Sequence, residues 1–297
     1  MQWVFFLWIA ELSECRSPKG DIPASLTQNM KNKSLPPENP KIPLICDVQK
    51  YKKYSRSEIS IPDYINPELA YLAGALRDGT ISKTETRIGT KYYIAYCNTS
   101  YSWLRNVIKP LIEKTFQIQI GEPLIDRKPT KFQIRTKKHG LVIYLADLFG
   151  HPFGKQSNWK TPPWILNAPK GIKKWYIRGF FDSEGGCGNV IKQRKKYPWQ
   201  STFFIGFYAS SPGNTCHVLN DISKLLSEFN IESKPTEKEK HSWKKRTVYL
   251  YKTKQNCFLL RIRDPKEKMK FIKRIGSSHP EKYSNLLELS KLIAAQS

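Results

Sequence analysis

Two apolar, helix-length segments that each end in an acidic residue and a glycine constrain this chain more than any other feature. Residues 71–79 read Tyr-Leu-Ala-Gly-Ala-Leu-Arg-Asp-Gly, and residues 177–185 read Ile-Arg-Gly-Phe-Phe-Asp-Ser-Glu-Gly. Small residues let two helix backbones approach closely. We therefore expect the two helices to pack together and to hold the Asp78 and Glu184 carboxylates side by side. The residues expected at this contact are Ala73, Gly74, Gly179 and Ser183.

The sequence order around the two segments is duplicated. Each segment is followed by strand-like runs, a helix, further strands and a helix that ends at a glycine. Phe132 and Gly150 are separated by 18 positions, as are Phe258 and Gly276, and both stretches read strand, basic turn, helix, glycine. In this register the equivalent basic residues are Arg135 with Arg261 and Lys137 with Arg263.

Three regions are expected along the chain. Residues 1–65 form an N-terminal extension, partly irregular and rich in Pro, Lys, Ser and Asn. The first repeat occupies residues 66–165, where Asn66 can cap a helix whose first residue is Pro67, and the second occupies residues 166–297. Strand-like residue patterns predict strands near 80–88, 91–98, 117–125, 131–136, 187–196, 201–209, 232–240, 246–252 and 257–263.

The composition favours a polyanionic partner and excludes several other classes. The chain carries 50 Lys and Arg against 25 Asp and Glu, a net charge of +25, which attracts phosphate backbones. Its six cysteines include no C-x-x-C pair and form no zinc spacing with the five histidines. The apolar run at residues 3–10 is far shorter than the roughly 20 residues of a membrane span. Nucleic acid is therefore the expected partner.

The position of the two acids indicates metal chemistry. Each lies at a helix C-terminus, where the negative end of the helix dipole disfavours a carboxylate unless a cation is near. Hydrolysis of a phosphodiester uses divalent cations, and carboxylate oxygens suit Mg²⁺. Asp182 projects from the helix about 200° away from Glu184 and is expected to be structural. We expect Asp78 and Glu184 to bind Mg²⁺ or Mn²⁺.

These segments resemble the two signature helices of LAGLIDADG homing endonucleases, in their single-chain, two-motif form. Residues 177–185 fit that motif position by position. The first segment departs from it, since Gly74 lies four residues before Asp78 whereas Gly179 lies five before Glu184, and Arg77 replaces a small residue. The resemblance implies an α+β fold of two pseudo-twofold-related αββαββα halves that form a DNA-binding saddle.

The resemblance also implies functional residues beyond the acids. A basic residue late in the fourth strand of each half would stabilise charge on the phosphate. The register offers Lys137 and Arg263, with Lys138, Arg135 and Arg261 as competing neighbours. Strand residues facing the groove would bind DNA, and the candidates are Lys83, Arg87, Lys91, Tyr93, Arg135, Lys192, Gln193, Arg194, Lys196, Gln200, Lys245 and Arg246.

Together these observations predict a monomeric enzyme that cleaves double-stranded DNA at a long, imperfectly palindromic site. The alternative is a nucleic-acid-binding protein of the same fold without cleavage activity, either an intron maturase, whose partner would include host intron RNA, or a decayed endonuclease. The chain ends in Ala-Ala-Gln-Ser rather than His-Asn, which favours an intron-encoded or free-standing protein over an intein. We expect it in the cytoplasm, or in an organelle matrix if an organelle encodes it.

Overall fold

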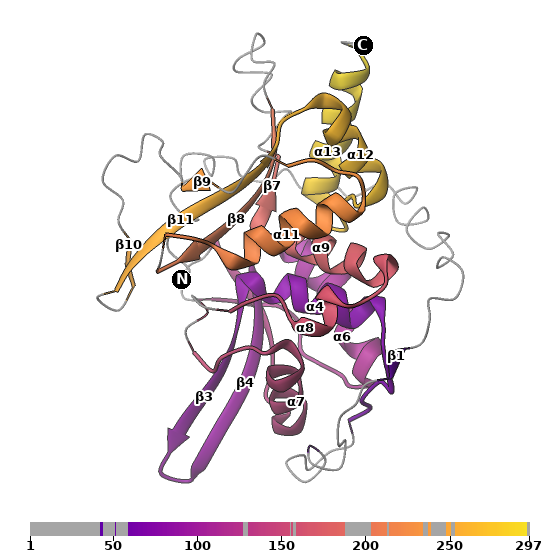
Figure 1. Ribbon diagram of the computed structural model, residues 1–297. Helices are drawn as coiled ribbons and strands as arrows, with labels where there is room; N and C mark the ends of the chain where they lie inside the picture. The colour runs from indigo at the N-terminus through magenta and orange to yellow at the C-terminus, as the bar shows by residue number, and fades with distance from the viewer. Residues whose placement is uncertain are drawn as a thin grey trace.

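Two α+β halves meet at a central pair of helices in the computed structural model (Figure 1). The ranges that it describes are residues 42–43, 51, 59–126, 130–154, 156, 159–187, 203–212, 214–233, 237–238, 248–250 and 253–295. Within these ranges no helix has the length and apolar character needed to cross a membrane.

The first half is built on a four-stranded antiparallel sheet in the order β3-β4-β6-β5. Its strands are β3 (Gly79–Thr86), β4 (Gly89–Asn98), β5 (Leu124–Ile125) and β6 (Phe132–Thr136). Its helical elements are α4 (Pro67–Ala75), the 3₁₀ turn η1 (Leu76–Asp78), α5 (Tyr101–Trp103), the π-helical η2 (Leu104–Ile108), α6 (Lys109–Phe116), α7 (His139–Phe149) and α8 (Pro163–Leu166).

The second half repeats this design with the sheet order β10-β11-β8-β7, and β9 also pairs with β11. Its strands are β7 (Gly185–Gly186), β8 (Ile205–Ser211), β9 (Glu237–Lys238), β10 (Val248–Leu250) and β11 (Thr253–Ile262). Its helices are α9 (Lys170–Glu184), α11 (His217–Glu228), α12 (Pro265–Arg274) and α13 (Pro280–Ala294).

Strand pairing confirms the internal duplication and its register. In the first half, the glycine after Asp78 pairs with Tyr96, which pairs with Ile134. In the second half, the glycine after Glu184 pairs with Phe207, which pairs with Leu260. Ile134 is therefore equivalent to Leu260, which is the 126-residue offset that also relates Phe132 to Phe258. Each sheet begins directly after its acidic residue.

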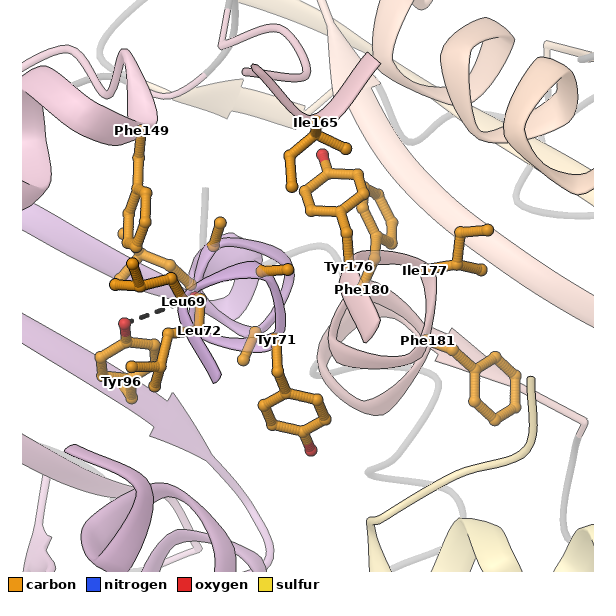
Figure 2. Packing of buried hydrophobic residues seen from close by; sticks show 14 of the residues in the cluster. Leu69, Tyr71, Leu72, Tyr96, Phe149, Ile165, Tyr176, Ile177, Phe180 and Phe181 are labelled. Carbon is orange, nitrogen blue, oxygen red and sulfur yellow. Dashed lines mark hydrogen bonds between the residues drawn. The ribbon is translucent and has the colours of Figure 1, made fainter. Parts of the chain in front are cut away.

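Apolar side chains surround the central helix pair on both sides. Leu69 and Leu72 of α4 lie in the core of the first half with Tyr96 and Phe149, as Figure 2 shows, and the Tyr96 hydroxyl donates a 3.3 Å hydrogen bond to the Leu72 carbonyl. On the other side, Tyr176, Ile177, Phe180 and Phe181 of α9 lie in the core of the second half. The helix pair is thus the shared wall of the two cores.

The folded core begins before residue 65. Ile59 and Ile61 are buried, and the buried Tyr51 donates a 2.9 Å hydrogen bond to Asp147 on α7. A short strand β1 (Ile42–Pro43) pairs with β2 (Tyr64–Ile65). At the start of α4, the Asn66 side chain accepts a hydrogen bond from Leu69 N, which confirms the predicted cap. Part of the N-terminal extension therefore belongs to the first half.

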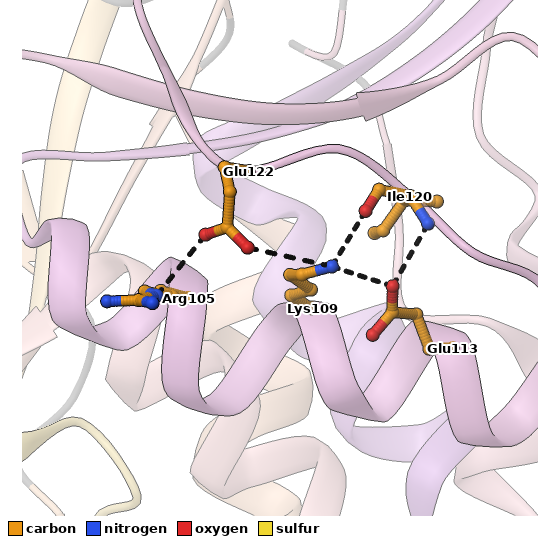
Figure 3. Close-up of polar contacts among 5 residues, drawn as sticks. All are labelled: Arg105, Lys109, Glu113, Ile120 and Glu122. Carbon is orange, nitrogen blue, oxygen red and sulfur yellow. Dashed lines mark hydrogen bonds and ion pairs between the residues drawn. The ribbon is translucent and has the colours of Figure 1, made fainter.

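The predicted strand at 117–125 is wrong over most of its length, because ion pairs rather than a ladder hold this segment (Figure 3). Lys109 of α6 donates to the Ile120 carbonyl at 2.7 Å and pairs with Glu113, which accepts from Ile120 N at 3.0 Å. Glu122 lies 3.3 Å from Arg105. The backbone polar groups of Ile120 are satisfied by side chains, so the strand is confined to Leu124–Ile125.

Candidate active site between two packed helices

The contact between α4 and α9 is a direct contact of backbones. A Cβ added at Gly74 would lie 2.6 Å from Phe180 N and even closer to the Tyr176 carbonyl. One added at Gly179 would lie 3.0 Å from Ala75 N and would overlap the Tyr71 carbonyl. These positions therefore exclude any side chain. Of the other residues predicted here, Ala73 is fully buried, and Ser183 donates a 3.2 Å hydrogen bond to the Gly74 carbonyl.

The helix contact places the two acids at neighbouring helix ends. Asp78 is the last residue of η1, and Glu184 is the last residue of α9. Burial, and after it the negative charge of Asp78, raise the pKa of Glu184 to about 8. Burial also raises the pKa of Asp78, although Lys131 opposes this shift. Two mutually repelling carboxylates that are partly removed from water form a site that favours a cation.

The donor set at this centre fits Mg²⁺ or Mn²⁺. The described residues include no group of three or more His, Cys, Asp and Glu that could hold a metal ion. A site of two carboxylates completed by water and phosphate oxygens is the way in which proteins commonly hold Mg²⁺. The two acids would therefore hold the metal together with its substrate, not as a closed protein cage.

Lys131 is the basic residue beside Asp78, and the sequence analysis missed it. Its Nζ lies 3.3 Å from the Asp78 carboxylate, and Asn98 Nδ2 lies 3.4 Å from the same group. Lys131 immediately precedes β6, whose first residues pair with the end of β4 near the acids. Antiparallel pairing of the strands could have identified Lys131, because the fourth strand starts beside the acids and runs away from them.

The predicted catalytic roles of Lys137 and Arg263 do not agree with this geometry. Lys137 follows the last residue of β6 and is exposed. Six residues of extended chain separate it from Lys131, which corresponds to about 20 Å. Arg263 is exposed at the equivalent position after β11. The prediction placed the basic residue at the wrong end of the strand.

Asp182 is a structural residue, as its direction from the helix predicted. It is fully buried, and it accepts hydrogen bonds from Tyr71 Oη at 2.6 Å, from Ser278 N at 2.8 Å and from the Ser277 hydroxyl. Trp103 Nε1 donates to the same Tyr71 oxygen at 2.9 Å. This network joins α4 of the first half to α9 and the closing segment of the second half.

Arg77, which departs from the motif, binds the linker between the halves. Its guanidinium donates to the carbonyls of Trp159 at 2.7 Å and Lys160 at 3.0 Å, and it lies 3.8 Å from the centre of the Trp159 ring. It also donates to Tyr176 Oη at 3.2 Å. The large side chain therefore leaves the helix contact and fixes the segment that leads into α9.

Strand pairing sorts the DNA-binding candidates of the first half by sheet face. Lys83 pairs with Tyr92, whose ring packs on His139 and Phe153 at the helix-covered face. Paired residues of an antiparallel ladder share a face, so Lys83 lies on the helix-covered face. There its side chain forms an ion pair with Glu85. The open face, opposite the helix-covered face, carries Lys91, Tyr93 and Arg135, and Arg87 lies at the β3–β4 turn.

The remaining DNA-binding candidates cannot be placed on a face. They lie outside the described residues, and they are Lys192, Gln193, Arg194, Lys196, Gln200, Lys245 and Arg246. In the described part of the second sheet, Arg261 pairs with Gly206 and occupies the position equivalent to Arg135.

The backbone contact makes a stability prediction. Gly179→Ala should lower the free energy of unfolding by about 1–3 kcal/mol, because even one methyl group overlaps the α4 backbone. Gly121→Ala is the control, since a Cβ there meets nothing within 4 Å. Urea denaturation measures both. Equal stability of the two variants would show that α4 and α9 do not touch at Gly179.

The shifted pKa of Glu184 makes a second prediction for the metal-free protein. Between pH 4.5 and about 8 the folded state holds a proton on Glu184 that the unfolded chain has lost. This contribution to stability therefore decreases as pH rises through that window. In EDTA, Glu184→Gln should melt at a higher temperature than wild type at pH 8, and the gain should shrink toward pH 5. The exposed Glu281→Gln is the control, and no gain at pH 8 would contradict the assigned repulsion.

Comparisons with known proteins agree with this architecture. Residues 172–276 match the family model described as a LAGLIDADG-like domain. The chain is 24% identical over 226 residues to the homing endonuclease I-ApeI of Aeropyrum pernix, a match that covers 74% of this chain and 86% of that protein. The crystal structure of I-DmoI in complex with DNA and Ca matches with a TM-score of 0.50 and 16% identity, over 75% of this chain and 97% of that chain.

A further match is confined to a small part of a larger protein. The chain is 24% identical over 174 residues to the tRNA-splicing ligase RtcB of Methanopyrus kandleri. The match covers 57% of this chain but 16% of that protein. It is therefore a similarity to one segment of the ligase.

Proposed function

We propose that the chain is a LAGLIDADG-type, site-specific, divalent-metal-dependent endonuclease that cleaves double-stranded DNA. The observation that carries this proposal is the pair of carboxylates, Asp78 and Glu184, at the packed ends of η1 and α9. Both acids of a cleaving centre are present, and Lys131 lies beside one of them. This arrangement favours cleavage over a binding protein of the same fold.

The residues of the chain have separate tasks in this function. Asp78 and Glu184 would hold Mg²⁺ or Mn²⁺, which when bound neutralises phosphate charge and favours a hydroxide nucleophile. Lys131 places a positive charge beside Asp78, where it can stabilise charge that develops on the phosphate. Lys91, Tyr93 and Arg135 lie on the open face of the first sheet. One chain supplies both halves, so we propose a monomer and a long, imperfectly palindromic target.

The first test of this function separates chemistry from binding. A cleavable duplex is selected from a randomised library with Mg²⁺. Asp78→Asn or Glu184→Gln should then abolish double-strand cleavage and leave binding to the selected duplex intact, because the acids hold metal while the basic sheet holds phosphates. The control is Glu281→Gln. A variant of either acid that cuts both strands at the wild-type rate would refute the site, and a wild-type protein that binds but never cuts would favour the non-cleaving alternative.

The second test addresses the sheet face. The affinity for DNA should fall log-linearly with salt concentration, with a slope of about −0.9 for each phosphate contact. Lys91→Met on the open face should make the slope shallower by about one unit. Lys83→Met, on the helix-covered face of the same hairpin, is the matched control and should leave the slope unchanged. Equal effects of the two variants would contradict the assignment of the DNA-binding face.

A further inference from the structure

Each half carries an arginine at the same place in its sheet. Arg135 of β6 pairs with Ala95 of β4, and Arg261 of β11 pairs with Gly206 of β8. Both pairs lie in the row of the sheet that contains the second residue after the acid of that half. In sheet register, the two arginines are therefore equally far from the two acids.

Both arginines lie on the face of their sheet that is opposite the core. The residues directly before and after each arginine are buried, and these residues are Ile134, Thr136, Leu260 and Ile262. Successive side chains of a strand point to opposite faces, so each arginine points away from the buried face. The Arg135 side chain is exposed on the open face, and the Arg261 side chain is partly exposed at the equivalent place in the second sheet.

An aromatic residue accompanies the arginine in both halves. The guanidinium carbon of Arg261 lies 5.1 Å from the centre of the Phe204 ring, within the roughly 6 Å over which a ring attracts a cation. Phe204 stands two residues before Gly206, and Tyr93 stands two residues before Ala95 at the equivalent position. An aromatic face beside a guanidinium restricts the orientation of its planar group. The arrangement therefore favours an arginine whose hydrogen-bond donors have a fixed direction.

An arginine of fixed orientation on a DNA-binding sheet suits one base in particular. Its guanidinium donates two parallel hydrogen bonds, and O6 and N7 of guanine accept both of them in the major groove. A contact to a phosphate would add affinity but no sequence information. The neighbouring position on the same face differs between the halves, since Gln133 is equivalent to Leu259. Identical base contacts are therefore expected at the two arginines and not at this neighbour.

We propose that Arg135 and Arg261 are specificity-determining residues that each bind one guanine. Because a twofold relation exchanges the two DNA strands, these guanines would lie on opposite strands, at equal distances from the midpoint of the target. This inference rests on the proposed endonuclease function. It assigns one symmetric pair of positions within an imperfectly palindromic site, and the difference between Gln133 and Leu259 accounts for an asymmetric pair beside it.

The test is the base preference of bound DNA. Duplexes with a randomised central region are selected for binding to the full chain in Ca²⁺, which can occupy a carboxylate site, and are then sequenced. Guanine should be enriched at two symmetry-related positions. Arg135→Met should remove the enrichment at one of them and Arg261→Met at the other, each reducing a preference of roughly 5- to 150-fold to none. Arg105→Met is the control, since it removes an exposed arginine from η2 and should leave both preferences intact.

Lysine variants separate base recognition from phosphate contact. Arg135→Lys and Arg261→Lys keep the positive charge but lack the planar fork of donors. They should therefore keep the wild-type dependence of affinity on salt and lose the guanine preference at one position each. These variants also carry the test if a methionine variant does not fold. Weaker binding with an unchanged base preference would show that the arginines contact phosphates, and enrichment of another base at these positions would overturn the proposal as well.

The proposed function can fail separately, because the selection requires binding and not cleavage. If the wild-type protein binds its selected duplexes but cuts none of them in Mg²⁺, the endonuclease function is wrong, and the guanine preference still decides the role of the arginines. If it cuts the selected site and no arginine variant changes the preference, the role of the arginines is wrong and the function stands. A protein that binds no duplex would overturn both.

Discussion

The close backbone contact of α4 with α9 is the constraint on which the rest of the structure depends. Gly74 and Gly179 bring main-chain atoms of the two helices together where no side chain fits. α4 continues through η1 into β3, the first strand of its sheet, and α9 leads directly into β7, the first strand of the other sheet. Proximity of the acids and the pseudo-twofold relation of the halves both follow from this one contact. Its cost is electrostatic, because two carboxylates come together at the negative ends of two helices.

Polar groups from distant segments fix this electrostatically unfavourable arrangement. Asp182 and Tyr71 form a buried hydrogen bond across the helix pair, and the Ser277–Ser278 segment completes the shell around Asp182. Buried polar networks are stabilising when every member has a partner. The same closing segment continues to Lys282, so the network that joins the halves also delivers a cation to the acid end of α9.

The local pattern of the sequence was sufficient to predict the acid helices and the repeat register, because both depend on spacing within one segment. Asn66, Gly74 and Gly179 were identifiable for the same reason. Lys131 and Lys282 were not, since their partners lie 53 and about 100 positions away in the chain. Lys137 was the wrong choice because residue spacing alone does not say which end of a strand lies beside the acids. Arg77 stands where the motif has a small residue because its side chain binds the carbonyls of the linker residues Trp159 and Lys160.

The most direct test of the account is the position of a bound metal. Crystals of the protein with a selected duplex and Mn²⁺ would be measured at the manganese absorption edge. The account predicts an anomalous peak between the helix ends, within coordination distance of both the Asp78 and Glu184 carboxylates, at roughly 2.0–2.2 Å. A protein that holds its catalytic Mn²⁺ elsewhere, with these two carboxylates unliganded, would contradict it.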